Sequence, residues 1–274
     1  MATTILITGA TDGIGREAAL RLAPLGHTLL LHGRSPDKLA AVRAEVAARQ
    51  GGGTPVADPG AIETYVADLS RLAEVAALAE AVAEHHPSLD VLINNAGVYR
   101  IADPATPDGL DARFAVNTIA PYLLTQRLLP LIGPSGRVIN VSSAAQSPVD
   151  LDALAGGPRL PDGAAYAQSK LAITMWSRAL ARSLADGPVV VAVNPGSLLG
   201  TKMVREGYGI TGADVGIGAD ILVRAALSEE FASASGQYFD NDNDRFAPPH
   251  PDALDAAKND AVVRTIESVI ASTG

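Results

Sequence analysis

Tyr166 and Lys170 stand four residues apart in the segment YAQSK, where their side chains could carry out acid–base chemistry together. We expect a helix over residues 164–185, and residues four apart lie on one face of a helix. A phenol titrates near ~10, and a neighbouring ammonium favours the phenolate, so Lys170 is expected to lower the pKa of Tyr166. The pair is therefore a candidate general acid/base that works near neutral pH. The alternative is that both residues merely decorate an exposed helix face.

Two more polar residues could assist this pair. Ser143 follows a predicted strand in NVSSA and could hydrogen-bond a substrate oxygen. The neighbouring Ser142 competes for that role, and either hydroxyl could simply cap a helix or a loop. Asn117 lies mid-helix in RFAVNTIAP, and Pro121, four residues later, has no N–H to donate to its carbonyl. The freed carbonyl could hold a water molecule in a proton relay, or the proline could only kink the helix.

A glycine-rich turn near the N-terminus is a candidate phosphate site. The apolar residues 5–7 form a short buried strand, and the chain then turns through Gly9, Gly13 and Gly15 before a helix over residues 16–25. Glycines let the backbone approach a ligand closely, and a helix N-terminus presents free N–H groups to a pyrophosphate. The spacing differs from the G-x-G-x-x-G fingerprint. Its position after an N-terminal buried strand nevertheless favours dinucleotide binding over an ordinary turn.

Strands and helices alternate along the whole chain, with no internal repeat and no change in composition. This alternation predicts one domain over residues 1–274: a doubly wound parallel sheet of about seven strands with helices on both faces. In such sheets ligands bind beyond the carboxyl ends of the strands, at the topological switch point. The strands are expected over residues 5–7, 28–32, 62–67, 90–94, 136–142, 189–194 and 236–239, and further helices over residues 37–50, 68–85, 109–132, 213–227 and 253–271.

The remaining segments are expected to be loops. Ser35 and Pro36 should begin the second helix as its cap and first residue, and Asp68, Leu69 and Ser70 should cap the third. We expect a surface loop over residues 51–60, a long loop over residues 143–163 and a flexible substrate loop or lid over residues 197–212. Residues 240–274 should form a C-terminal extension.

The composition predicts an acidic, soluble protein. The chain has 274 residues, of which 47% are hydrophobic, enough for the core of one large α/β domain. A net charge of −9 without a block of basic residues argues against binding to nucleic acid. No apolar run reaches the ~18 residues of a membrane span, and the early first strand leaves no room for a signal peptide. We therefore expect a cytoplasmic protein that does not contact membranes.

No metal site is expected. The chain has no cysteine, and the adjacent His85 and His86 diverge on a helix. The acidic stretch 240–244 imitates a calcium loop, but Arg245 and Pro251 stand where an EF-hand needs glycine and glutamate. We expect a solvated acidic turn there.

Taken together, these segments resemble the short-chain dehydrogenase/reductase family over nearly the whole chain. Each motif is weak alone, but their conjunction, in the family's order and spacing, is specific. The motifs are Thr8-Gly9-Ala10-Thr11-Asp12-Gly13-Ile14-Gly15, Asn94-Asn95-Ala96-Gly97, Asn117, Ser143, Tyr166-x-x-x-Lys170 and Pro195-Gly196.

The resemblance implies a nicotinamide cofactor and assigns roles to the residues above. Tyr166 would be the general acid/base, Ser143 would orient the substrate oxygen, Lys170 would hold the ribose hydroxyls and the Asn117 carbonyl would anchor a water to that lysine. The cofactor-binding residues that it implies are Gly9, Thr11, Asp12, Gly13, Ile14, Gly15, Arg34, Asp68, Leu69, Asn95, Ala96, Gly97, Tyr166, Lys170, Pro195, Gly196, Leu198 and Thr201.

Within the family, the chain is most similar to the branch of retinol-dehydrogenase-like enzymes and carbonyl reductases. The long separation between Ser143 and Tyr166 points there, as do the segments APYLLTQRLLPLI and NPGSLLGT. The chain lacks the N-terminal anchor of the membrane-bound retinol enzymes, so a retinoid substrate is not expected.

The end of the second strand indicates which dinucleotide is preferred. An acidic residue there would bind the adenosine 2′-hydroxyl, but this chain has Gly33 and then Arg34, which can grip a 2′-phosphate. Asp12 favours NAD(H), since many NADP-dependent relatives carry a basic residue at its position. Because Arg34 should lie nearer the phosphate, we expect NADP(H).

The leading hypothesis is an NADP(H)-dependent oxidoreductase that interconverts a small-molecule carbonyl and an alcohol by hydride transfer. One alternative is a catalytically silent sensor that binds NADP(H) and a partner on the same fold, and another is elimination or epimerisation. The helices at 109–132 and 164–185 should each carry two apolar faces, which predicts pairing into a homodimer or homotetramer. A helix inserted in residues 144–163 could cover those faces instead.

Overall fold

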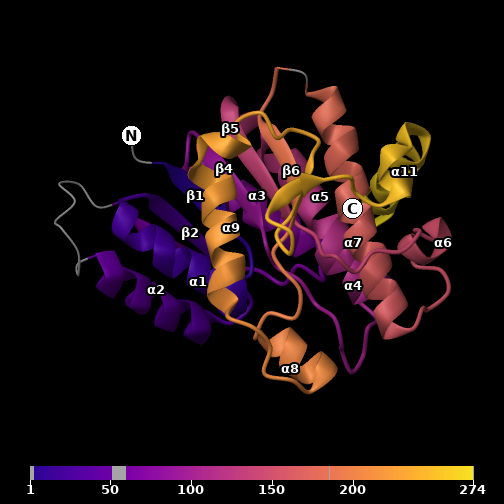
Figure 1. Cartoon of the computed structure of the whole chain (residues 1–274), viewed down its shortest axis with the longest axis horizontal. Helices are drawn as coiled ribbons and strands as arrows, with labels where there is room; N and C mark the ends of the chain where they lie inside the picture. Colours follow the sequence, from indigo (N-terminus) through magenta and orange to yellow (C-terminus); the bar gives the residue numbers. More distant parts are fainter. Residues whose placement is uncertain (1–2, 51–59, 185, 274) are drawn as a thin grey trace.

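A computed structural model describes residues 3–50, 60–184 and 186–273, and shows one sheet of eight strands flanked by helices (Figure 1). The strand order is β3-β2-β1-β4-β5-β6-β7-β8. β1 to β7 run parallel, so the chain order reverses between β1 and β4, where the doubly wound fold has its switch point. The strands are β1 Thr4–Ile7, β2 Thr28–Gly33, β3 Ile62–Val66, β4 Leu89–Asn94, β5 Ile132–Val141, β6 Val189–Asn194, β7 Tyr238–Asp240 and β8 Arg245–Ala247.

Alternating side chains of the central strands build two cores, one on each face of the sheet. Ile5 and Ile7 pack on one face with α1 (Gly13–Leu22), α2 (Pro36–Gln50) and α9 (Val215–Leu227), while Leu6 packs on the other. The second face is covered by α3 (Leu72–His85), α5 (Ala120–Leu128), α7 (Asp162–Ser183) and α11 (Ala256–Thr273). The predicted doubly wound sheet with helices on both faces is therefore confirmed.

One strand was not predicted. β8 pairs antiparallel with β7 at the sheet edge, across the turn that follows Asp240. Asp244 adopts a left-handed φ of 46° in this turn, a conformation that Asp and Asn tolerate better than most residues. The acidic stretch 240–244 is thus the corner of a hairpin, and the C-terminal extension contributes a strand to the sheet.

The helix caps follow the prediction at α2 and differ from it at α3. The Ser35 hydroxyl accepts a hydrogen bond from the Lys38 N–H, as expected at the start of α2. At α3 the first N–H, that of Leu72, donates to the Asp108 carboxylate, which comes from a distant loop. Asp68 instead accepts from Ser70 in a local turn, so the predicted cap of α3 is wrong.

Two predicted loops contain helices. Within 143–163 lies α6 (Leu151–Leu154), whose Leu154 is fully buried. Within 197–212 lies α8 (Lys202–Tyr208), which Thr201 caps through its hydroxyl. Backbone hydrogen bonds between the residues on either side of α8 close this loop at its base. The helix within 197–212 was not predicted, and the role of this segment as a flexible substrate loop or lid stays a prediction. The predicted loop at 51–60 lies outside the described residues except at its last position.

The C-terminal helix covers the face of α7 that was expected to be exposed. Leu171 and Met175 on one side of α7, and Ala172 and Trp176 on the other, are all buried. α11 packs along α7 and supplies Val262, Ile266 and Val269 to the same core (Figure 1). The structural premise of the homodimer prediction, an exposed apolar face on α7, is wrong for the described residues. Within residues 3–50, 60–184 and 186–273, none of the helices is long and apolar enough to cross a membrane.

Candidate active site

A cavity of about 820 Å³ lies at the carboxyl ends of the parallel strands, on both sides of the switch point. Of the residues predicted for the site, only Gly15 and Asn117 do not line it; both lie directly behind lining residues. The predicted residues that line it are Gly9, Thr11, Asp12, Gly13, Ile14, Arg34, Asp68, Leu69, Asn95, Ala96, Gly97, Ser143, Tyr166, Lys170, Pro195, Gly196, Leu198 and Thr201. The structure thus brings together segments from the whole chain.

The glycine turn forms a cradle that larger residues would fill. Gly9 and Gly13 have left-handed φ angles of 67° and 52°. A Cβ on Gly9 would lie 2.9 Å from the Ala96 Cα, and a Cβ on Gly15 would lie 2.4 Å from the Gly9 oxygen. Gly15 therefore acts from behind the cavity wall, by letting α1 approach the turn closely.

Polar side chains hold this turn in place. The Thr8 hydroxyl accepts from the backbone N–H groups of Asn95 and Ala96, and the Asn95 amide donates to the carbonyls of Thr8 and Gly9. His32 Nδ1 accepts from the Gly9 N–H, while Nε2 lies 3.0 Å from the Ala67 oxygen. Burial lowers the pKa of His32 to about 4, so the ring is neutral and can accept this bond. Sequence analysis missed His32, because no local pattern marks it.

Two cations stand at the end of β2. Arg34 and Lys38 are both exposed and line the cavity, and among the described residues neither has an acidic partner within ion-pair distance. Lys38 was not predicted, although it follows Arg34 by four residues at the start of α2. Asp12, which favours the other cofactor, accepts a hydrogen bond from the Gly13 N–H as the cap of α1. The free charge at this end is therefore positive and suits a phosphate.

Tyr166 and Lys170 share a face of α7, as predicted, with the lysine Nζ 5.8 Å from the centre of the tyrosine ring. Lys170 is 3% exposed and donates to the Val141 carbonyl at 2.8 Å. Burial lowers the pKa of Lys170 to about 8. Burial also raises the pKa of Tyr166 to about 12, a rise that a hydrogen bond with Ser143 opposes. The predicted lowering of the Tyr166 pKa is therefore wrong for the protein by itself, because desolvation is the largest influence on this phenol.

The two candidate serines have different surroundings. Ser142 is 2% exposed, and its hydroxyl donates to the Lys170 carbonyl and lies 2.8 Å from the Thr174 hydroxyl, so it joins β5 to α7. Ser143 lines the cavity, and its side chain opposes the rise in the pKa of Tyr166. Its own carbonyl accepts from the Tyr238 hydroxyl at 3.1 Å. The geometry favours Ser143 as the residue that contacts a substrate oxygen.

Asn117 lies on a π-helical turn, Ala115–Ile119, and is fully buried. Its amide is engaged on both sides: Oδ1 accepts from the Val98 N–H, and Nδ2 donates to the Val98 carbonyl and the Ser169 hydroxyl. The side chain therefore clamps the segment after β4 to α7. Only the backbone carbonyl remains for the predicted water relay, and that role stays a prediction.

Aromatic rings that sequence analysis missed surround Tyr166. Tyr99 meets the Tyr166 ring edge-on at 5.1 Å between centroids and stacks on Tyr208 at 5.7 Å. Met203, from α8, also lines the cavity. Tyr99 belongs to the loop after β4, whereas Met203 and Tyr208 belong to the predicted substrate loop. Their proximity depends on the fold of that loop, so no spacing in the sequence indicates it.

The acidic turn holds the loop after β6. Asp242 accepts from the Ser197 N–H and hydroxyl and from the Asn194 amide, and these bonds lower the pKa of its carboxyl although partial burial opposes them. Asn241 donates to the Pro195 carbonyl. Leu198 follows with a left-handed φ of 52°. The predicted solvated turn therefore has a structural partner, namely the loop that lines the cavity.

The whole arrangement fits a dinucleotide. It offers a backbone cradle at a helix N-terminus, cations at the end of β2, and a tyrosine–lysine pair at the opposite end. Residues 9–15 and 95–97 would hold the pyrophosphate of the dinucleotide, and Tyr166 and Lys170 would hold its nicotinamide half.

Comparisons with known proteins agree with this geometry. The family model for short chain dehydrogenases matches residues 3–208. Human retinol dehydrogenase 13 is 34% identical over 272 residues, covering 92% of this chain and 80% of the relative. A Streptomyces protein named "Putative daunorubicin C-13 ketoreductase DnrU" is 36% identical over 267 residues, covering 93% of this chain and 89% of the relative.

A solved structure is similar as well. The landomycin C-6 ketoreductase LanV, determined with bound NADP and rabelomycin, superposes with a TM-score of 0.67 at 30% identity. The superposition covers 87% of this chain and 94% of LanV.

Proposed function

The chain belongs to the short-chain dehydrogenase family, and we propose that it is an NADP(H)-dependent reductase that converts a carbonyl to an alcohol. The observation that carries the proposal is the meeting of Ser143, Tyr166 and Lys170 at the end of a cavity whose other end is a glycine cradle. A silent sensor needs the cradle but neither Ser143 nor Tyr166.

The preference for NADP(H) is supported by Arg34 and Lys38. Both reach the cavity as exposed cations. Of the nearby carboxylates, that of Asp12 accepts from the Gly13 N–H and that of Asp68 accepts from Ser70. The NADP bound to LanV supports the same choice. In this proposal the two cations hold the 2′-phosphate, which Arg34 grips through its guanidinium.

Tyr166 acts as the general acid. Its pKa of about 12 keeps the phenol protonated at neutral pH, so it holds a proton for a carbonyl oxygen. Ser143, which lines the cavity together with Tyr166, orients that oxygen, and Lys170, whose Nζ lies 5.8 Å from the centre of the Tyr166 ring, holds the ribose. When bound, the reduced cofactor supplies the hydride. The acid form of Tyr166 is the form that carbonyl reduction requires.

The rings around Tyr166 suggest the class of substrate. Tyr99 and Tyr208 give this end of the cavity flat aromatic walls, which suit a carbonyl attached to an aromatic ring system. Two relatives are ketoreductases whose names refer to daunorubicin and landomycin. We therefore propose an aromatic ketone as the preferred substrate.

Mixing the protein with NADPH and a panel of aromatic and aliphatic carbonyls tests the function. The proposal expects loss of the absorbance of reduced nicotinamide and formation of the alcohol, with aromatic ketones turned over fastest. Binding of NADPH without turnover of any carbonyl would favour the sensor, and a product without net oxidation of NADPH would favour elimination or epimerisation.

The homodimer or homotetramer predicted from the sequence stays a prediction, as does the cytoplasmic location. Because α11 already covers α7, any pairing would have to use another surface. Light scattering at micromolar concentration gives the assembly directly.

A further inference from the structure

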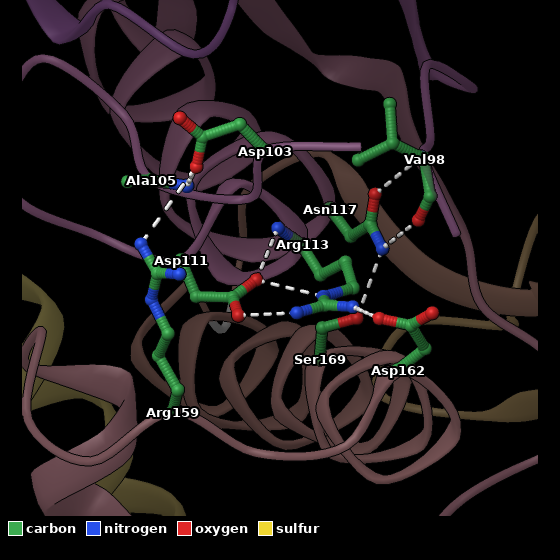
Figure 2. Close-up of polar contacts among 9 residues, drawn as sticks. All are labelled: Val98, Asp103, Ala105, Asp111, Arg113, Asn117, Arg159, Asp162 and Ser169. Carbon is green, nitrogen blue, oxygen red and sulfur yellow. Dashed lines mark hydrogen bonds and ion pairs between the residues drawn. The ribbon is translucent and has the colours of Figure 1, made fainter. Parts of the chain in front are cut away.

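The segment that carries Asn117 and the helix that carries Tyr166 are joined at two places along α7, at Ser169 and at Asp162 (Figure 2). At the first place, the Asn117 amide donates to the Ser169 hydroxyl at 3.0 Å, and the Thr118 hydroxyl donates to the Ser169 carbonyl at 2.8 Å. Ser169 directly precedes Lys170. This contact is part of the site already described.

The contact at Asp162 is formed by a buried arginine that the mechanism above does not use. Arg113 is 1% exposed, although it is one of the largest side chains in the protein. Its Nε donates to Asp111 Oδ1 at 2.8 Å and its Nη2 to Asp111 Oδ2 at 2.5 Å. Its remaining terminal nitrogen, Nη1, donates to the Asp162 carboxylate (Figure 2).

The carboxylates of Asp111 and Asp162 have different roles in binding Arg113. A buried guanidinium must be neutralised, and Asp111, whose side chain is 9% exposed, does so through a bidentate pair. Asp111 also accepts from the Arg113 N–H as the cap of its own short helix, so this pair is local. Asp162 is 47% exposed and is not needed to neutralise a charge that Asp111 already pairs.

The place of Asp162 in the fold gives its contact a purpose. Asp162 is the first residue of α7, and Tyr166 stands four residues further on, one turn along the same helix. Arg113 likewise precedes Asn117 by four residues. The contact therefore ties the first turn of the helix that carries Tyr166 to the segment that carries Asn117.

We propose that Arg113 is a positioning residue that, through Asp162, fixes the first turns of α7 and hence places Tyr166 and Lys170 relative to Asn117. The proposal rests on the proposed function for its catalytic consequence. Arg113 itself touches neither the cavity nor the reacting groups. The nearby pair of Arg159 and Asp103 is exposed on both sides and contributes little to this arrangement.

Asp162→Asn is the sharpest variant, because it removes the negative charge that pairs α7 with Arg113 and leaves the buried pair of Arg113 and Asp111 intact. Replacing Arg113 itself would leave Asp111 buried without a partner and could unfold the protein. Asp260→Asn is the matched control. It removes the charge of the ion pair between Asp260 and Arg182, near the other end of α7; Asp260 is 51% exposed, close to the 47% of Asp162, whereas Arg182 is 43% exposed.

The proposal expects Asp162→Asn to lower kcat by about 10–100-fold, as for a displaced catalytic group. The KM for the carbonyl should stay within about threefold, and the pH profile of kcat should shift because Tyr166 and Lys170 change their position relative to Asn117. Asp260→Asn should leave kcat and the profile unchanged. If both variants alter the melting temperature alike and leave kcat and the profile unchanged, Arg113 has only a structural role and the proposal is overturned.

A binding measurement keeps this test independent of turnover. Asp162→Asn should weaken NADPH binding by about threefold or more in the wild-type background, but not in a Lys170→Met background, because its effect passes through the lysine. Equal weakening in both backgrounds would overturn the positioning role. Wild-type protein that binds NADPH but reduces no carbonyl would refute the proposed function alone, and wild-type protein that binds no NADPH would refute both.

Discussion

The two ends of the cavity are built in different ways. At the cradle end, the wall is backbone: Gly9 and Gly13 in left-handed conformations, and α1 packed so closely that Gly15 has no room for a Cβ. At the end beyond Tyr166, the wall is side chains, with the rings of Tyr99 and Tyr208 brought together from separate loops. The first end has one permitted shape, whereas the second can change its lining without changing the fold.

This difference suggests a division of labour. A rigid backbone cradle suits a ligand that is the same in every turnover, and a side-chain wall suits a substrate that differs among related enzymes. Substitutions at the cradle end should therefore affect stability and cofactor binding strongly, and substitutions at the aromatic end should affect substrate choice moderately.

The largest effect is a loss of folding stability in acid, which we expect from protonation of His32 at the cradle end. Burial lowers its folded pKa to about 4, below the ordinary ~6.5, so the unfolded chain binds the proton first. Stability from the neutral ring is complete above pH ~6.5 and is lost as the pH falls towards 4, by about 2–4 kcal/mol. Chemical denaturation across this range should show the loss in wild type and not in His32→Gln. If the free energy of unfolding of wild type and of His32→Gln depends on pH in the same way, protonation of His32 does not affect folding stability.

The next effect is expected from Gly15→Ala. The new Cβ would meet the Gly9 oxygen at 2.4 Å, and relieving this overlap should distort the cradle at a cost of about 1–3 kcal/mol. NADPH affinity, measured by fluorescence titration, should fall by roughly 10–100-fold. Gly133→Ala is the control, since nothing lies within 4 Å of a Cβ there. Unchanged NADPH affinity in Gly15→Ala would show that the cradle is not the pyrophosphate site.

A smaller and more selective effect is expected from Arg34→Ala. Loss of a charge-assisted hydrogen bond should weaken NADPH binding by ~1–3 kcal/mol and leave NADH binding little changed. Lys38→Ala should act in the same direction. Equal losses for both cofactors would mean that Arg34 does not contact the 2′-phosphate.

The smallest effect is expected at the aromatic end. Tyr208→Ala removes a stacked ring that is 54% exposed. The loss of about 0.5–1.5 kcal/mol of binding free energy should raise the KM for an aromatic ketone roughly 2–10-fold. The KM for an aliphatic ketone and the affinity for NADPH should stay unchanged. An equal rise for both ketones would argue against ring recognition.

The same contrast explains what the sequence could predict. Gly9, Gly13 and Gly15 mark the cradle because only glycine fits it, and Tyr166 and Lys170 mark α7 because helical spacing alone brings them to one face. The continuous apolar run of β1 likewise predicts a strand that is buried on both faces of a sheet. These features are local, so a segment of about ten residues carries each of them.

Other features depend on contacts between distant segments. His32, Tyr99 and Tyr208 act on residues that lie far from them in the chain, and no spacing predicts those contacts. The covering of α7 by α11 was missed because an apolar helix face does not indicate what packs on it. The Tyr166 pKa was predicted in the wrong direction because burial, the largest influence on it, is a property of the fold.

Tyr166→Phe tests the central claim most directly, since it removes one oxygen and the proton that it would donate. The account predicts that kcat for carbonyl reduction falls by about 10²–10⁴-fold, while the dissociation constant for NADPH, measured on the same samples, stays nearly the same. Retention of more than about a tenth of kcat, a change of under ~1.4 kcal/mol in the barrier, would contradict it.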